Sequence, residues 1–212
     1  PDMTVRRGED WGEPGPLAAS APACSDDATA ASAIRSQIGS GAAVPEVGLL
    51  GGDLHTTLGA PLRSETELRT GAGVRFPVDV IEVAATAPDG SVTHLTGLAH
   101  LEVRRRRRFV GRTVVVMNAA FVGRANLGPR AHPNDGRLDV TEGSLPRGSR
   151  REGLRRSLSG THVPHPGLSE RRVSELTIDA VDGLRWWLDG VRMPPASRLV
   201  VTCRPDGATV VA

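Results

Sequence analysis

The 212-residue chain carries 26 basic and 24 acidic residues, for a formal net charge of +2, and 39% of its residues are hydrophobic. These values are typical of a globular protein with a core, built as one domain or as a small domain joined to a larger one. No run approaches the roughly 18 apolar residues of a membrane helix, and the first residues lack the basic-then-apolar order of a secretory signal. With two widely separated cysteines, Cys24 and Cys203, we expect a cytoplasmic protein with reduced thiols.

Charge is unevenly distributed along the chain, and every basic residue is an arginine. Residues 1–60 contain eight acidic residues and three arginines, whereas residues 61–212 contain 23 arginines and 16 acidic residues. A basic half suits phosphate, nucleic acid or an anionic lipid surface as a partner, and its sign alone does not choose among them.

The first 60 residues predict a truncated α/β element. A short strand is expected at Met3–Arg6 and a helix at Ala28–Ile38, which Ser25, Asp26 and Asp27 would cap. A buried strand at Pro45–Leu50 then leads into a glycine turn. One helix and one strand are too few for a complete nucleotide-binding domain.

Residues 61–212 predict a two-sheet antiparallel β-sandwich, so that the protein as a whole is mainly β. Turn dipeptides such as Asp89-Gly90, Asp182-Gly183 and Asp206-Gly207 separate short runs of strand-like composition. The expected strands are Val78–Ala84, Val92–Val103, Thr113–Met117, Leu138–Thr141, Val173–Ile178, Leu184–Leu188, Leu199–Cys203 and Thr209–Val211. Ser149–Leu158 is the helix expected in this half.

The stretch from Val114 to Val140 is the most specific motif in the chain. An apolar strand ends at Asn118, a glycine- and proline-containing loop follows, and a second strand begins directly after Asp135-Gly136. The order of these residues resembles the C-terminal half of the diacylglycerol kinase family, bacterial lipid kinases related to sphingosine kinases in the NAD kinase-like superfamily. The matching positions are Asn118, Gly123, Pro129, Ala131, Asp135, Gly136, Leu138, Asp139 and Val140. The alternative is an ordinary strand–loop–strand.

The resemblance implies a structural Mg²⁺ in the loop that ends this motif. Its ligands would be the side chain of Asp135 and the backbone carbonyls of His132 and Arg137, oxygen donors that suit a hard cation. The alternative is that Asn134, Asp135 and Gly136 form a hairpin-type turn without a metal.

The resemblance also implies a nucleotide contact at Gly51, Gly52 and Asp53. No Gly-Thr follows Asp53, so the backbone nest that wraps phosphate oxygens is incomplete, and the Thr and Asn that precede the family's aspartate are missing. The alternative is an aspartate that begins a helix packed on the sheet.

A third implied site is the catalytic one. In active lipid kinases a strand ends in Asp-Gly-Glu, whose glutamate is the general base for the lipid hydroxyl. Here Asp189 and Gly190 match, but Val191 takes the place of the glutamate. Asp189 is therefore the candidate for a displaced base, and its alternative role is that of a turn residue.

Five consecutive arginines, Arg104–Arg108, predict an exposed hairpin end, because a core strand cannot hold charges on both faces. They would be solvated or would face anionic lipid headgroups, with the protein peripheral at a membrane. Nucleic acid is the less favoured partner, since few aromatic residues accompany them.

Together the motifs predict a catalytically degenerate lipid-kinase homologue that binds a lipid or phosphorylated small molecule. One alternative is an active ATP-dependent lipid kinase completed by residues before Pro1 or by a partner chain. The other is a basic nucleic-acid-binding module. The sequence leaves the lipid and the oligomeric state open.

Overall fold

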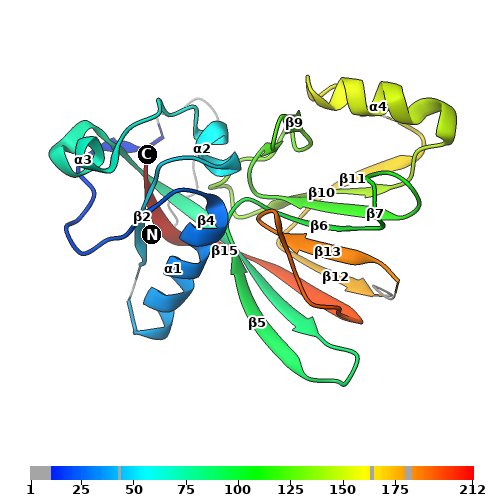
Figure 1. The fold of residues 1–212 in the computed structure, drawn as a ribbon, viewed down its shortest axis with the longest axis horizontal. Helices are drawn as coiled ribbons and strands as arrows, with labels where there is room; N and C mark the ends of the chain where they lie inside the picture. Colours follow the sequence, from blue (N-terminus) through cyan, green and yellow to red (C-terminus); the bar gives the residue numbers. More distant parts are fainter. Residues whose placement is uncertain (1–10, 43, 163–164, 180–182) are drawn as a thin grey trace.

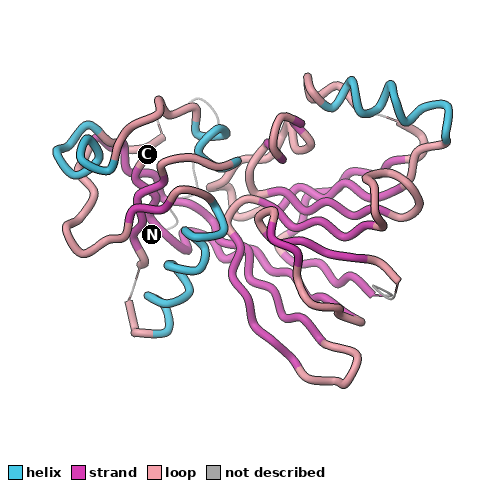
Figure 2. Tube along the Cα trace, viewed as in Figure 1, coloured by secondary structure: helices cyan, strands magenta, loops and turns pink. Residues whose placement is uncertain are grey.

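The computed structural model describes residues 11–42, 44–162, 165–179 and 183–212. Figure 1 shows an α/β unit on the left, with α1 and α2, and two packed sheets on the right. Strands dominate the described chain and most of their pairings are antiparallel, as Figure 2 makes plain, so the prediction of a mainly β two-sheet sandwich with a small α/β element is confirmed.

The larger sheet has seven strands in the order β1-β4-β15-β3-β2, with β5 paired to β4 and β12 paired to β15. Its strands are β1 (Glu13–Pro14), β2 (Ala23–Cys24), β3 (Glu46–Leu49), β4 (Val74–Thr86), β5 (Val92–Gly97), β12 (Glu175–Asp179) and β15 (Arg198–Val211). Only the pairings of β3 with β15 and with β2 are parallel among the described residues.

The smaller sheet is antiparallel, with six strands in the order β11-β10-β7-β6-β13-β14. Its strands are β6 (His100–Arg104), β7 (Thr113–Met117), β10 (Leu138–Gly143), β11 (Leu168–Val173), β13 (Arg185–Leu188) and β14 (Val191–Arg192); β8 (Phe121–Val122) and β9 (Ala125–Asn126) form a separate hairpin. The helices are α1 (Asp27–Gly39), α2 (Asp53–Leu58), α3 (Glu65–Glu67), a π-helical turn (Leu68–Ala72), a 3₁₀ turn (Arg147–Ser149) and α4 (Arg150–Ser157).

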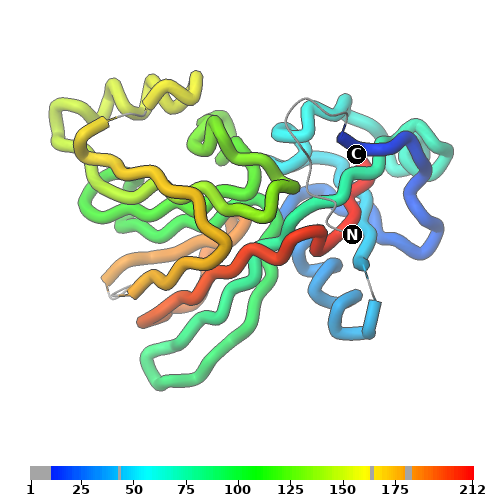
Figure 3. Tube along the Cα trace, turned by 180° about the vertical axis from the view of Figure 1, so that it is seen from behind, coloured from blue at the N-terminus to red at the C-terminus, as the bar shows by residue number. Residues whose placement is uncertain are grey.

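The two long strands β4 and β15 join the α/β unit to the sandwich. They pair from Arg75 opposite Val211 to Thr86 opposite Arg198, and Figure 3 shows them crossing the molecule side by side. At one end β15 also pairs with β3, and at the other with β12. A single sheet therefore passes through both parts, and the division of the chain at residue 60 stays a prediction.

Alternation along β4 serves two cores. Val78 and Val80 pack with α1 and β3 in the α/β unit, whereas Ile81 and Val83 face the opposite side, into the core between the two sheets. The sandwich core also contains Trp186 from β13, which is buried.

Several local predictions agree with the structure. The helix predicted at Ala28–Ile38 is α1, whose N-cap Asp26 forms a capping box with Thr29. The strand predicted at Pro45–Leu50 is β3, and the helix predicted at Ser149–Leu158 is α4. Met3–Arg6 and Asp182 lie outside the described residues.

Two predicted strands were wrong because each crosses from one sheet to the other. Val92–Val103 divides into β5 and β6 at Leu98 and Ala99, and Val173–Ile178 divides at Ser174 between β11 and β12. Both runs have continuous strand composition, and nothing in composition marks where the backbone leaves one sheet for the other.

The prediction of a turn at Asp206-Gly207 was also wrong. Residues 198–211 are one strand, β15, with a bulge between Arg204 and Ala208 opposite Val78–Val80. A Cβ on Gly207 would lie 2.8 Å from the side chain of Val80, so glycine is required for the close approach of the bulge to β4.

The carboxylate of Asp79 holds this bulge against the loop that follows Asn118. It is 1% exposed and accepts the backbone N–H groups of Asp135, Gly136 and Asp206 at 3.0, 2.7 and 3.1 Å. The Asn118 amide donates to the carbonyl of Asp79 at 2.9 Å. Burial raises the pKa of Asp79 to about 6, against the opposing effect of the three N–H donors.

Asp79→Ala should lower the free energy of unfolding by about 3 kcal/mol or more, because three buried N–H groups lose their acceptor. Urea denaturation measures the change. Asp179→Ala is the matched control: its side chain is 70% exposed, so the loss should stay within about 0.5 kcal/mol. Equal losses in the two variants would contradict the role assigned to Asp79.

Candidate functional site

Four ionisable side chains gather where the α/β unit meets the sandwich. Asp27 comes from the first turn of α1, Asp53 from the start of α2, His100 from β6, and Asp189 from the turn between β13 and β14. The helices, β6 and the β13–β14 turn are far apart in sequence, and the long sheet of β4 and β15 brings them together.

Asp27 caps a helix other than its own. Its carboxylate accepts the N–H groups of Asp53 and Leu54 at 2.6 and 3.2 Å, which are otherwise unpaired donors at the start of α2. A Cβ at Gly52 would lie 2.7 Å from the carboxylate oxygens, and the backbone there has a φ of 109°. Gly52 is therefore needed for the close approach of Asp27. Burial, with a smaller effect of Asp189, raises the pKa of Asp27 to about 7.

Asp53 faces the sandwich. One carboxylate oxygen accepts the N–H of Gly123 at 2.8 Å, and the other lies 3.5 Å from Nδ1 of His100. His100 is 1% exposed, and neither ring nitrogen has a hydrogen-bond partner among the described residues. Gly51 lies beside the carbonyl of Ser25. The three residues predicted to contact nucleotide thus join α2 to α1 and to β8.

Asp189 opens a two-residue hairpin turn. It has a φ of 47° and Gly190 a φ of 78°, the conformation that Asp-Gly favours between paired strands. Its carboxylate accepts three backbone N–H groups, from Leu98 at 2.8 Å, Ala99 at 2.8 Å and His100 at 3.0 Å. Burial raises the pKa of Asp189, with His100 and the three amides opposing. The carboxylate thereby fixes the chain where it crosses between the sheets.

Three neighbouring cavities lie around the edge strand β5. A cavity of about 210 Å³ between α1 and the Asp189 turn is lined by Arg35, Leu95, Val191 and Met193. A groove of about 410 Å³ on the outer face of the sheet shares Arg35 and Leu95 with it. A recess of about 160 Å³ shares Leu95 and Met193 and adds Trp186. Together they run from a charged to an apolar surface.

Arg35 supplies the positive end of these cavities. It is exposed on α1, and no carboxylate of the described residues pairs with it. The other end is formed by Leu95, Trp186 and Met193. Asp189 and Glu82 also line the two cavities that contain Arg35, so the charged end holds both a guanidinium and carboxyl groups.

The loop predicted to bind Mg²⁺ holds an arginine at its carboxylate. Asp135 pairs with the guanidinium of Arg172, which also lies 3.4 Å from Asp139, and it accepts the N–H of Arg137 at 3.0 Å. The ring of His132 packs against Trp11, with the centroids 4.7 Å apart and the ring planes tilted by 46°. In the described part of the chain no three His, Cys, Asp or Glu side chains group as metal ligands. The guanidinium of Arg172 thus occupies the cation position beside Asp135, and the Mg²⁺ with Asp135 and the carbonyls of His132 and Arg137 stays a prediction.

The five arginines do not share one environment. Arg105, Arg106 and Arg107 are exposed in the loop between β6 and β7, as predicted. Arg104 and Arg108 instead both pair with Glu102, which is 3% exposed, at 3.0 and 2.6 Å. The guanidinium of Arg104 also stacks 3.8 Å above Trp187. A fully solvated or fully lipid-facing run is therefore wrong for two of the five.

Sequence reasoning placed Asp53 and Asp189 in the site but missed Asp27 and His100, and outside the site it missed the buried Asp79. Asp27 looks like an ordinary first-turn acid of α1, and His100 stands in an apolar run without a motif. Asp79 carried a usable signal, since an acid inside the apolar run Val78–Ile81 has to find partners when buried.

Comparison with known proteins agrees with this architecture. Residues 80–212 match the family described as "YegS C-terminal NAD kinase beta sandwich-like domain", and the chain belongs to that family. A diacylglycerol kinase from Bacillus anthracis shares the fold, with a TM-score of 0.50 and 14% identity over 78% of this chain and 66% of that one. A putative diacylglycerol kinase from the same organism has a TM-score of 0.50 and 12% identity over 78% of this chain and 68% of that one. No curated protein matches the chain.

These likenesses confirm the family predicted from residues 118–140, at the level of fold. The chain spans less than two thirds of the first relative's length, so the activity of that whole protein does not transfer with the fold. In the described residues, no helix has the length and apolar character to cross a bilayer.

Asp27→Asn should flatten part of the pH dependence of stability. With its pKa raised to about 7, folded Asp27 binds a proton that the unfolded chain releases near its ordinary value, so its stabilising contribution is lost as pH rises through 7. Relative to the Asn variant, the wild type should lose unfolding free energy between about pH 4 and about pH 7 and change little above that. Urea denaturation over this range measures the unfolding free energy of wild type and of Asp27→Asn. The contributions of the buried histidines are the same in both proteins and cancel in the difference. A difference independent of pH would show that Asp27 is ionised throughout.

Proposed function

We propose that this protein is a lipid-kinase homologue that binds an anionic amphiphile, of the phosphorylated-lipid class, without transferring phosphate. The observation that carries the proposal is the arrangement at the Asp189 turn. Val191, 50% exposed, lines the cavity in the place of the family's glutamate.

Phosphoryl transfer to a hydroxyl relies on positioning and on a group that accepts the hydroxyl proton. Valine cannot accept a proton. Asp189 could act only by giving up amide donors at Leu98, Ala99 and His100, which fix the crossing between the sheets. The geometry therefore supports binding over catalysis.

The cavities around β5 support an amphiphile as the ligand. A phosphate monoester fits the guanidinium of Arg35, which pairs with no carboxylate of the described residues, through charge-assisted hydrogen bonds. Acyl carbons fit the recess at Leu95 and Trp186.

The alternative is an active ATP-dependent kinase completed by residues before Pro1 or by a partner chain. Those residues or that partner would have to supply both the general base and the phosphate loop. A nucleic-acid module would show binding that falls steeply with salt and is indifferent to lipid.

The purified chain should bind short-chain phosphatidate and should not make it from ATP and diacylglycerol. Isothermal titration measures the binding, with diacylglycerol of the same chain length and inorganic phosphate as separate ligands. Arg35→Ala should weaken phosphatidate binding about tenfold, the size expected for a lost charged hydrogen bond. Arg124→Ala, an exposed arginine in the β8–β9 turn, is the matched control and should change nothing.

Mg²⁺-dependent formation of phosphatidate above a heat-killed control would overturn the non-catalytic part of the proposal. Equal binding by wild type and Arg35→Ala would remove Arg35 from the site.

We further propose that Arg172 takes the place of a metal ion at Asp135. A chelator should then leave the melting temperature of the wild type unchanged, whereas Arg172→Ala should lower it, because Asp135 and Asp139 would face each other without a cation. Arg171→Ala, an exposed neighbour paired with Glu142, is the control. Wild-type melting that shifts with chelator, and no longer shifts in Asp135→Ala, would return Mg²⁺ to the loop.

A further inference from the structure

Helix α4 packs on the protein with its small residues and exposes its large ones. Gly153 and Ser157 are buried, and a Cβ on Gly153 would lie 2.5 Å from the side chain of Leu145. Leu154 and Leu158, one helical turn apart, are 47% and 57% exposed. A helix that served only the core would face its leucines inward.

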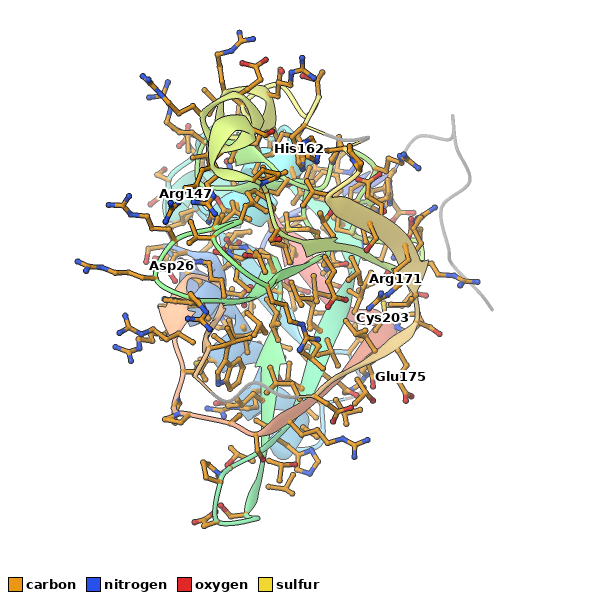
Figure 4. All side chains as sticks on the ribbon, turned by 90° about the vertical axis from the view of Figure 1, so that its right-hand side faces the viewer. Asp26, Arg147, His162, Arg171, Glu175 and Cys203 are labelled. Carbon is orange, nitrogen blue, oxygen red and sulfur yellow. The ribbon has the colours of Figure 1, made fainter. Side chains whose placement is uncertain are left out.

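The exposed leucines lie next to a row of arginines. At 100° per residue, Arg151 and Arg155 border the leucine pair on the side away from the buried Gly153 and Ser157. Between Arg147 and Leu158 there are five arginines and one acidic residue, Glu152. Figure 4 shows side chains fanning outward from α4 at the top of the view.

A second basic segment is fixed beside this helix. The carbonyl of Phe109 accepts the N–H of Leu145 at 3.0 Å, and both side chains belong to one buried cluster. The loop with exposed Arg105, Arg106 and Arg107 is thus held against the segment that leads into α4, although about 40 residues separate them. We call this combined surface, α4 with residues 105–107, the basic surface.

From this geometry we infer that the basic surface docks on anionic lipid bilayers, with Leu154 and Leu158 inserted and the arginines at the headgroups. An exposed apolar pair bordered by arginines is the pattern of a helix lying in a membrane interface. Charge complementarity selects an anionic bilayer over a neutral one. A polyanion such as DNA would use the arginines but not the leucines.

The inference is independent of the ligand proposed for the cavities at β5. Those cavities are tested with a short-chain lipid in solution, so either idea can fail without the other.

Vesicle co-sedimentation tests the docking. Wild type should bind phosphatidylcholine–phosphatidylglycerol vesicles at low salt and keep part of that binding at about 0.15 M salt, where the Debye length is about 8 Å. Leu154→Gln/Leu158→Gln should lose about tenfold in affinity at the higher salt and keep the wild-type circular dichroism and melting temperature. Leu62→Gln, at an exposed leucine in the α/β unit, should bind as wild type.

A fluorescent label provides a second readout that does not depend on affinity. Cys24 and Cys203 are buried, so a polarity-sensitive dye would attach at Leu158→Cys and, in the control, at Leu62→Cys. Only the label at position 158 should shift to shorter wavelength when anionic vesicles are added. No binding of wild type at low salt, equal binding by the double glutamine variant, or equal shifts at both labels would overturn the inference. Binding to double-stranded DNA that is unaffected by the leucine substitutions, without vesicle binding, would assign the surface to nucleic acid instead.

Discussion

Buried aspartate carboxylates that accept backbone N–H groups fix the irregular backbone on which the rest of this structure depends. Asp27 fixes the start of α2, Asp79 fixes the β15 bulge and the loop after Pro133, and Asp189 fixes the crossing from β5 to β6. Each joins segments far apart in the chain, at places where the backbone leaves regular pairing and its donors would otherwise be unsatisfied. Two or three such donors offset part of the desolvation of each carboxylate, and burial still raises the pKa of all three.

This use of carboxylates bears directly on function. A catalytic base needs a lone pair that is free to accept a proton, whereas Asp189 is engaged with three amides and its neighbour Val191 is apolar. Asp189 holds the crossing between the two sheets through these amides, whereas catalysis in the family would depend on the residue two positions later. Under the proposed function, a valine at position 191 removes the base while the sandwich stays intact and its cavities stay available for binding.

The sequence predicted those features that depend on local order. The α1 cap at Asp26, the β7 strand and the Asp-Gly turn at residue 189 follow from neighbours in the chain, and the pattern from Asn118 to Val140 was specific enough to predict the family. Features set by distant partners were not predictable. The breaks at Leu98 and Ser174 arise where the chain changes sheets, and the pairing of Asp135 with Arg172 joins a loop to a strand 37 residues later. Which face of α4 is buried likewise depends on the contact of Gly153 with Leu145. The helical periodicity of the sequence does not predict this contact.

Amide hydrogen exchange at Leu98, Ala99 and His100 tests most directly whether the Asp189 carboxylate is structural. In the wild type these three amides should be protected, and in Asp189→Ala they should lose protection while Val115 and Val116 in the neighbouring strand β7 keep theirs. Unprotected amides in the wild type, or unchanged protection in Asp189→Ala, would contradict the account and free Asp189 for a catalytic role.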